Sequence, residues 1–146
     1  MVKVLLLGGH GKVSLKMTTL LAARGHHITS IIRNPVHASE IQSLSPLVTP
    51  VISSIEDATD ASAEALMKGI DWVVWSAGAG GMGKERTKAV DEDGAKRFIA
   101  AAIRSQDVKR FLMVSASCAR RTPASWYDEE DIKVISTLPP ELTPYR

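Results

Sequence analysis

The sequence predicts an α/β fold in which five parallel strands form a doubly wound sheet with helices on both faces. Three observations predict it. Apolar runs of strand length alternate with segments of helical spacing between residues 2 and 115. A glycine-rich turn joins the first such strand to the first helix. Pro50 removes a backbone donor from the third strand, which indicates an edge position and therefore the strand order 3-2-1-4-5.

Composition excludes several classes of protein. The chain has 146 residues, the size of one domain, and its charged residues (23%, net charge +2) are interspersed. That distribution favours neither nucleic acid nor a membrane surface as a partner. No signal peptide is evident, and no apolar run approaches the ~20 residues of a transmembrane helix. The single cysteine, Cys118, cannot form an internal disulfide, which predicts a cytoplasmic protein.

The first element is an apolar strand over residues 2–7, and helical spacing follows over residues 12–24. A helix that opens directly after a strand offers unpaired N–H groups and a positive dipole end to an anion. The turn between them fits two dinucleotide-binding patterns, Gly9-x-Gly11-x-x-Ser14 and Gly8-x-x-Gly11-x-x-Ser14. The sequence thus predicts a pyrophosphate cradle at Gly8–Gly11, and a plain tight turn is the alternative.

Four apolar residues of the first helix share one face, Val13, Met17, Leu20 and Leu21, and we expect Val13 and Met17 to be core residues. Lys12, on its first turn, is either a second phosphate partner or a surface lysine. The second strand covers residues 26–33, and Asn34-Pro35 ends it. Arg33 stands where an acidic residue would hold the ribose of NAD, and its guanidinium suits a 2′-phosphate. NADP is therefore favoured over NAD, against the alternative of a solvated arginine.

The remaining elements follow in alternation. We expect a short helix over 35–44, a third strand over 47–52 and a helix over 60–68 that Thr59 or Asp60 caps. The fourth strand (71–75) leads into a glycine-rich loop (76–83), and the longest helix (85–105) and fifth strand (111–115) follow. The long helix should bury Phe98, Ile99, Ala102 and Ile103, and a last helix is expected over 129–136.

Taken in order, six segments resemble the atypical short-chain dehydrogenase/reductase proteins with an NmrA-like NAD(P)-binding domain. They are Leu7-Gly8-Gly9-His10-Gly11-Lys12-Val13-Ser14, Ile32-Arg33-Asn34-Pro35, Gly69-Ile70-Asp71-Trp72-Val73-Val74, Ser76-Ala77-Gly78, Val90-Asp91-x-x-Gly94-Ala95-Lys96-Arg97-Phe98 and Arg110-Phe111-Leu112-Met113-Val114-Ser115. The resemblance implies a Rossmann domain over residues 1–116, with residues 117–146 as an irregular or helical tail of the same domain.

The resemblance also implies a bound dinucleotide, NADP more than NAD. The pyrophosphate would lie over the glycine loop, the 2′-phosphate at Arg33, and the nicotinamide ribose beside the second loop. The expected cofactor-binding residues are Gly8, Gly9, His10, Gly11, Lys12, Val13, Arg33, Asn34, Ser54, Ile55, Ala77 and Gly78. Ser54 stands near the place of an aspartate that the family carries beside the adenine.

The catalytic residues that the family carries are only partly matched in this sequence. Ser115 matches the family serine that helps to bind a substrate carbonyl, and Tyr145 is the candidate proton donor. Active members carry a lysine four residues after the tyrosine, but Tyr127 is followed at that spacing by Asp131. Position 91 also departs from the family pattern, because Asp91 stands where asparagine is common. Three functions stay open: an NADP-dependent oxidoreductase or isomerase for a small carbonyl substrate, a non-catalytic NADP(H)-sensing regulator, or an inactive shortened form.

Two further expectations concern metals and partners. The four histidines and Cys118 match no zinc spacing, so no metal site is expected. The apolar fifth strand would form an open sheet edge unless a tail or another chain covers it. A homodimer through this edge is therefore a candidate assembly.

Overall fold

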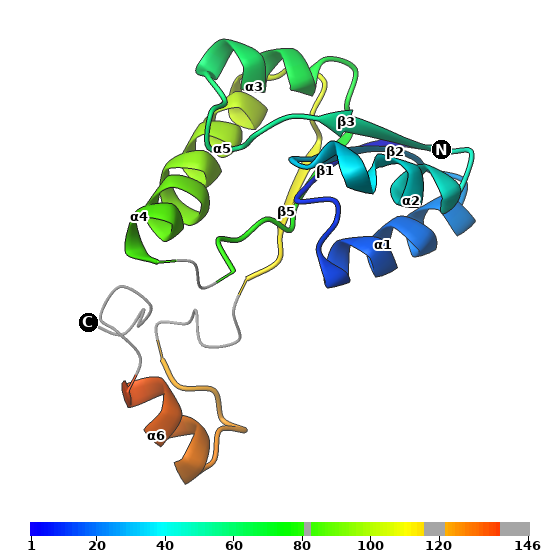
Figure 1. The fold of residues 1–146 in the computed structure, drawn as a ribbon. Helices are drawn as coiled ribbons and strands as arrows, with labels where there is room; N and C mark the ends of the chain where they lie inside the picture. Colours follow the sequence, from blue (N-terminus) through cyan, green and yellow to red (C-terminus); the bar gives the residue numbers. More distant parts are fainter. Residues whose placement is uncertain (81–82, 116–121, 138–146) are drawn as a thin grey trace. The chain divides into compact units, whose positions relative to one another are not determined.

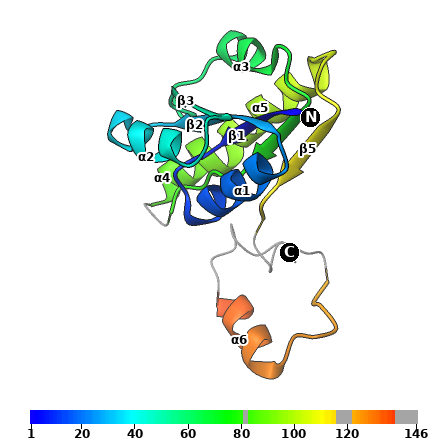
Figure 2. The same ribbon diagram turned by 90° about the vertical axis from the view of Figure 1, so that its right-hand side faces the viewer.

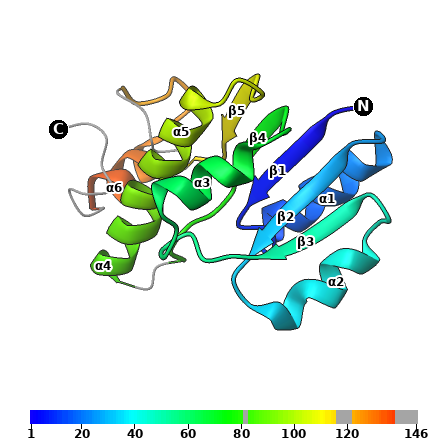
Figure 3. The same ribbon diagram turned by 90° about the horizontal axis from the view of Figure 1, so that it is seen from above.

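The computed structural model describes residues 1–80, 83–115 and 122–137. The chain divides into two compact units, Met1–Val114 and Ser115–Arg146, and each is described by itself. The first unit contains one five-stranded parallel sheet in the order β3-β2-β1-β4-β5, with helices on both faces (Figures 1 and 3). The predicted fold class and strand order are confirmed.

The elements follow the predicted alternation. The strands are β1 (Lys3–Leu7), β2 (His27–Ile32), β3 (Val48–Ile52), β4 (Trp72–Trp75) and β5 (Arg110–Met113). The helices of the first unit are α1 (Lys12–Ala23), the 3₁₀ turn η1 (Pro35–His37), α2 (Ala38–Ser43), α3 (Asp60–Met67), α4 (Lys84–Thr87), the π-helical segment η2 (Lys88–Gly94) and α5 (Ala95–Arg104). The second unit contains α6 (Glu129–Thr137).

β1 is the central strand and pairs with β2 and β4. Its last residue, Leu7, lies opposite Ile31 of β2 and Trp75 of β4, so the three strands end level with one another. In a parallel sheet the loops that follow such strands meet at one edge, which is where doubly wound folds bind ligands. The register therefore brings the glycine loop beside residues 33 and 76.

The core has two layers, because β1 is buried on both faces. Leu5 and Leu7 pack with Met67, Trp75 and Phe98 under α3 and α5. Val4 and Leu6 pack on the other face with residues of β2, α2 and β3, under α1: Ile28, Ile32, Ile41 and Val48. Figure 3 shows the two helix layers on opposite sides of the sheet.

The buried face of α1 differs from the predicted one. Val13 is 50% exposed, so its assignment to the core was wrong, and Leu20 on the same predicted face is 57% exposed. Ser14 and Thr18 are fully buried instead, and Met17 and Leu21 pack at the margin of the core. These small residues let the helix approach β1 closely. The buried hydroxyl of Ser14 has a hydrogen-bond partner, because Ser14 Oγ donates to Gly8 O at 2.7 Å.

The predicted long helix is interrupted. α4 passes into the π-helical η2, and α5 follows. Phe98 and Ala102 are buried as expected, but Ile103 is 78% exposed, which corrects its assignment to the core. Gly94, at the end of η2, packs so tightly that an added Cβ would lie 2.7 Å from Ile55 Cγ2. The π segment thus accommodates a close approach between this helix and the loop after β3.

The last elements are an edge strand in the first unit and a helix in the second unit. Among the described residues β5 pairs with β4 alone and forms one edge of the sheet, and β3 forms the other (Figure 2). α6 begins with reciprocal hydrogen bonds between Asp128 and Asp131, where the Asp131 N–H donates to Asp128 Oδ1 at 2.8 Å. In the described part of the chain, no helix is long and apolar enough to cross a bilayer.

Candidate functional site

The loop between β1 and α1 is held by its own backbone. The Gly9 N–H donates to Ile31 O at 2.8 Å, and the Gly11 N–H donates to Gly8 O at 3.0 Å. Gly11 occupies the N-cap of α1 in an extended conformation and contributes no side chain to the first helical N–H groups. The loop therefore presents these N–H groups and the positive end of the α1 dipole at the carboxyl edge of the sheet.

Two of its glycines are sterically required. Gly8 has φ +81°, and an added Cβ would lie 2.6 Å from Ala77 Cα and 2.8 Å from Ser76 O. At Gly9 the same atom would lie 1.9 Å from Ser30 Oγ. Gly8 thus permits contact with the loop after β4, Gly9 permits contact with β2, and both leave close access for a ligand.

The loop after β4 is fixed from the opposite side. The Ser76 N–H donates to Leu7 O at 2.9 Å, and the Ala79 N–H donates to both oxygens of Asp91 at 3.2 Å. Asp91 belongs to η2, so the π-helical segment anchors this loop. The aspartate that departs from the family pattern therefore has a structural role here.

A cleft of about 370 Å³ opens where these loops meet. Its volume falls within the range of small-molecule sites. Five segments line it, those after β1, β2, β3 and β4 and part of the α4–η2 helix. The lining residues are Gly8, Gly9, His10, Gly11, Ile31, Ile32, Arg33, Asn34, His37, Ser53, Ile55, Glu56, Ser76, Ala77, Gly78, Arg86 and Val90.

Two arginines converge on one carboxylate at this cleft. Arg33 Nη1 lies 3.2 Å from Glu56 Oε1, and Arg86 Nε lies 2.8 Å from the same oxygen. They come from the end of β2, the loop after β3 and α4. With two guanidinium charges and one carboxylate, these three residues carry a net charge of +1.

The cleft gathers most of the residues that the sequence predicts to bind a cofactor. It does not include Lys12 and Val13, which are exposed on the first turn of α1, or Ser54, whose Oγ accepts from the Asp57 N–H at 3.2 Å. Ser115 is the first residue of the second unit, and Tyr145 lies outside the described residues. The roles of all these residues stay predictions.

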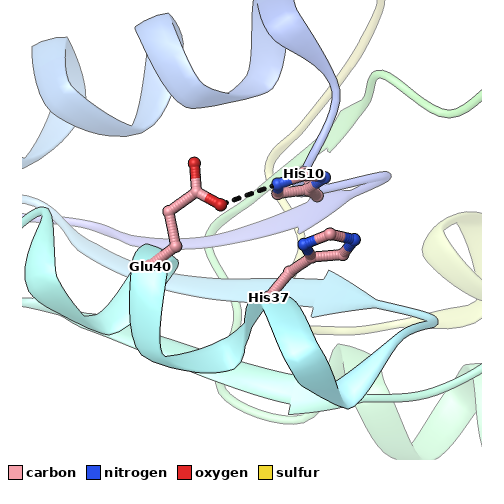
Figure 4. Close-up of side chains that lie close together, drawn as sticks. All are labelled: His10, His37 and Glu40. Carbon is pink, nitrogen blue, oxygen red and sulfur yellow. Dashed lines mark hydrogen bonds and ion pairs between the residues drawn. The ribbon is translucent and has the colours of Figure 1, made fainter.

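Several lining residues were not predicted. Arg86 and Glu56 come from segments 30 positions apart, and neither carries a local motif. His37, in the segment where a short helix was expected, lines the cleft and stacks on His10, with ring centroids 3.5 Å apart. His10 Nε2 in turn contacts Glu40 Oε2 at 2.9 Å (Figure 4).

Comparison with known proteins gives the family. The family model described as NAD(P)H-binding matches residues 8–137. A UPF0659 protein of Schizosaccharomyces pombe is 32% identical over 94% of this chain and 57% of its own length. YhfK of Bacillus subtilis, an uncharacterized sugar epimerase, is 32% identical over 78% of this chain and 52% of its own length. The chain thus spans about half the length of these curated relatives.

Solved structures agree on the fold. A provisionally assigned NAD-dependent epimerase/dehydratase of Bacillus halodurans superposes with a TM-score of 0.71 and 28% identity, over 82% of this chain and 53% of that one. The negative transcriptional regulator Nmra in complex with NAD superposes with a TM-score of 0.65 and 16% identity, over 80% and 34% of the two chains. The resemblance inferred from the motifs is confirmed. The chain belongs to the NAD(P)H-binding family and has its Rossmann-like, epimerase- and reductase-type fold.

Proposed function

We propose that this chain binds NADP(H) in the cleft at the carboxyl ends of β1, β2 and β4. One observation carries the proposal: a loop whose glycines are sterically required faces a pair of arginines across a single cleft. The glycine loop suits a pyrophosphate, because its backbone can approach closely and α1 begins there. The arginines suit a further phosphate.

Within this proposal, each part of the cofactor has its own partners. The pyrophosphate lies over Gly8–Gly11 and the first turn of α1, where Lys12 and Val13 contribute N–H groups. The adenosine lies between Asn34 and the residues after β3, Ser54 and Ile55. The nicotinamide ribose lies beside Ala77 and Gly78, which the Asp91 carboxylate holds in place through Ala79.

The charge balance supports NADP(H) over NAD(H). The 2′-phosphate is the group that distinguishes the two cofactors, and Arg33 occupies the position after β2 where an acid would favour NAD. Arg86 adds a second guanidinium, and Glu56 neutralises one of the two charges. Both guanidinium groups can form charge-assisted hydrogen bonds with the 2′-phosphate.

The activity that we propose first is that of an NADP-dependent oxidoreductase or isomerase, as the epimerase-type relatives suggest. Ser115 would bind a substrate carbonyl, and Tyr145 would donate the proton. A second candidate, a non-catalytic NADP(H) sensor, is favoured by Tyr127, because the lysine that active family members carry four residues after the tyrosine does not follow it. Tyr127 has Asp131 at the spacing of the family lysine, and the Asp131 carboxylate accepts a hydrogen bond from the Asp128 N–H at 3.3 Å.

Fluorescence titration of the purified chain with NADPH and NADH tests the binding proposal. We expect saturable NADPH binding at micromolar concentrations and weaker NADH binding. No binding of either below millimolar concentrations would contradict the dinucleotide site, and equal affinities would contradict the role of Arg33. NADPH oxidation with a panel of small carbonyl compounds then separates the candidates, because a sensor binds the cofactor without turnover.

We also propose that two copies of the chain pair through β5. This edge strand exposes Leu112 and Met113 at 49% and 46%, and within the described residues it pairs with β4 alone, so its other side can accept another strand. Light scattering should give the mass of a dimer. The double variant Leu112→Lys, Met113→Lys should be monomeric with the same NADPH affinity, whereas a wild-type monomer would refute this pairing.

A further inference from the structure

Three side chains with metal-ligating atoms lie close together, His10, His37 and Glu40 (Figure 4), and the two histidines also line the cleft. One nitrogen of each imidazole and one Glu40 oxygen lie within 4.8 Å of one another. His10 comes from the glycine loop, His37 ends η1 and Glu40 lies in the first turn of α2. Two separate segments of chain therefore converge on one point.

The chemistry of this trio is that of a transition-metal site. Imidazole nitrogens favour Zn²⁺, Co²⁺, Ni²⁺ and Cu²⁺, whereas Mg²⁺ and Ca²⁺ favour sites built from oxygen. Two histidines and one glutamate also form the ligand set of a common class of zinc site that leaves one position open. The i, i+3 spacing of His37 and Glu40 places both on one face of the helical turn.

The distances allow closure with side-chain movement alone. Ligand atoms about 2.0–2.1 Å from a tetrahedral zinc ion lie about 3.4 Å apart. His10 Nε2 and Glu40 Oε2 are 2.9 Å apart and need to separate by about 0.5 Å, whereas no pair among the three atoms exceeds 4.8 Å, so none needs to shorten by more than about 1.4 Å. A metal ion lies in the plane of each imidazole that binds it. Because the two rings stack at 11°, one of them must turn out of the stack.

We propose that His10, His37 and Glu40 form a binding site for one divalent transition-metal ion of the Zn²⁺ class. Bound there, the ion links the glycine loop to the η1–α2 turn across the rim of the cleft. His10 and His37 are half-buried and Glu40 is exposed, so the ion reaches the site from solvent. The sequence did not indicate this site, because 26 positions separate the two histidines.

Calorimetric titration of the chelator-treated chain with Zn²⁺, without nucleotide, tests this site. We expect one Zn²⁺ per chain with micromolar affinity, and no saturable binding of Mg²⁺. His37→Asn and Glu40→Gln should each lower Zn²⁺ affinity by about tenfold or more, as expected for the loss of one of three ligands. Co²⁺ should give the visible absorption bands of a low-symmetry site in the wild-type chain and lose them in both variants.

Two matched variants control for binding elsewhere. His27→Asn removes an exposed histidine at the amino end of β2, and Cys118→Ser removes the thiol. Both should bind Zn²⁺ as the wild type does. Absence of saturable Zn²⁺ binding, or equal loss of affinity in a control variant, would overturn the proposal. Because no dinucleotide is present, this result stands apart from the NADPH titration, and either proposal can fail alone.

Discussion

The two ends of the parallel sheet each carry a cleft, and the clefts have similar volumes, about 370 Å³ at the carboxyl end and about 430 Å³ at the amino end. Their linings differ. The carboxyl end presents two glycine loops and the Arg33–Arg86 pair. The amino end presents Met1, Val2, Lys3, His27, Thr29, Lys68, Gly69, Ile70 and Asp71.

The amino end uses its charges to join strands. The Asp71 carboxylate accepts from the Lys3 N–H at 2.9 Å and from Lys109 Nζ at 2.8 Å, which connects β1, β4 and β5. The hydrogen bond from Lys109, and then that from Lys3, holds the pKa of the Asp71 carboxyl below its ordinary value. The two clefts thus differ in chemistry more than in volume, because close-approach glycines, helix N–H groups and two arginines lie at the carboxyl end.

The glycine loop should give the largest contrast between the two ends. Gly8→Ala combines a left-handed backbone, worth about 1–2 kcal/mol, with an overpacked contact worth about 1–3 kcal/mol. Gly25→Ala, before β2, has φ +76° but no atom within 4 Å of the added Cβ, so about 1–2 kcal/mol is expected. Urea unfolding measures both, and NADPH binding should be lost in Gly8→Ala alone. Equal destabilisation would contradict the close approach to Ala77.

Arg33→Ala should have the next largest effect, a loss of affinity for NADPH. Loss of a charge-assisted bond worth about 1.5–3 kcal/mol lowers NADPH affinity by roughly tenfold to a hundredfold and leaves NADH affinity unchanged. Arg104→Ala is the matched control, because Arg104 also pairs with an exposed carboxylate, Glu64, at 2.7 Å. Parallel titrations of the two cofactors check it. A similar loss for NADH would remove the 2′-phosphate from this position.

Glu56→Gln should act in the opposite direction. It removes the carboxylate that competes with the 2′-phosphate for Arg33 and Arg86. A unit charge at about 4 Å in water contributes about 1 kcal/mol, so NADPH affinity should rise about fivefold. NADH affinity should not change. Weaker NADPH binding would show that Glu56 orients the arginines instead of competing for them.

The smallest effect is expected at the amino end. Because the folded pKa of Asp71 is lowered from 3.8, its ion pair with Lys109 and its hydrogen bond from the Lys3 N–H stabilise the fold above that pH and lose this contribution as the pH falls through the folded pKa. The unfolding midpoints of wild type and Asp71→Asn should therefore converge below about pH 4. NADPH affinity should be unchanged. A difference that persists into stronger acid would contradict the pairing with Lys109.

Local patterns predicted most of the fold. Apolar runs, Pro50 and the glycine turn define strands, an edge and a strand-to-helix junction within short windows, and the sheet confirms each of them. The details that failed depend on packing between distant segments. Helical periodicity does not show that Ser14 and Thr18 are buried in place of Val13, because this burial depends on how closely α1 approaches β1.

The residues of the candidate site also fall into two groups, those that local sequence patterns locate and those that packing brings to the cleft. Gly8–Gly11 and Arg33 follow strands directly, so strand ends locate them. Arg86, Glu56 and His37 reach the cleft only through the paths of α4, the loop after β3 and η1. Their convergence is set by the packing of these elements, for example by the contact of Gly94 with Ile55, and no short motif encodes it.

Amide hydrogen exchange with and without NADPH reports both ends of the sheet at once and therefore tests whether the dinucleotide binds at the glycine loop. We predict increased protection at Gly8–Gly11 and at Ala77–Gly78, with no change at Lys3, Gly69 or Asp71. Protection at the amino end instead, or no change at either end under saturating NADPH, would contradict the assignment of the dinucleotide to the glycine loop.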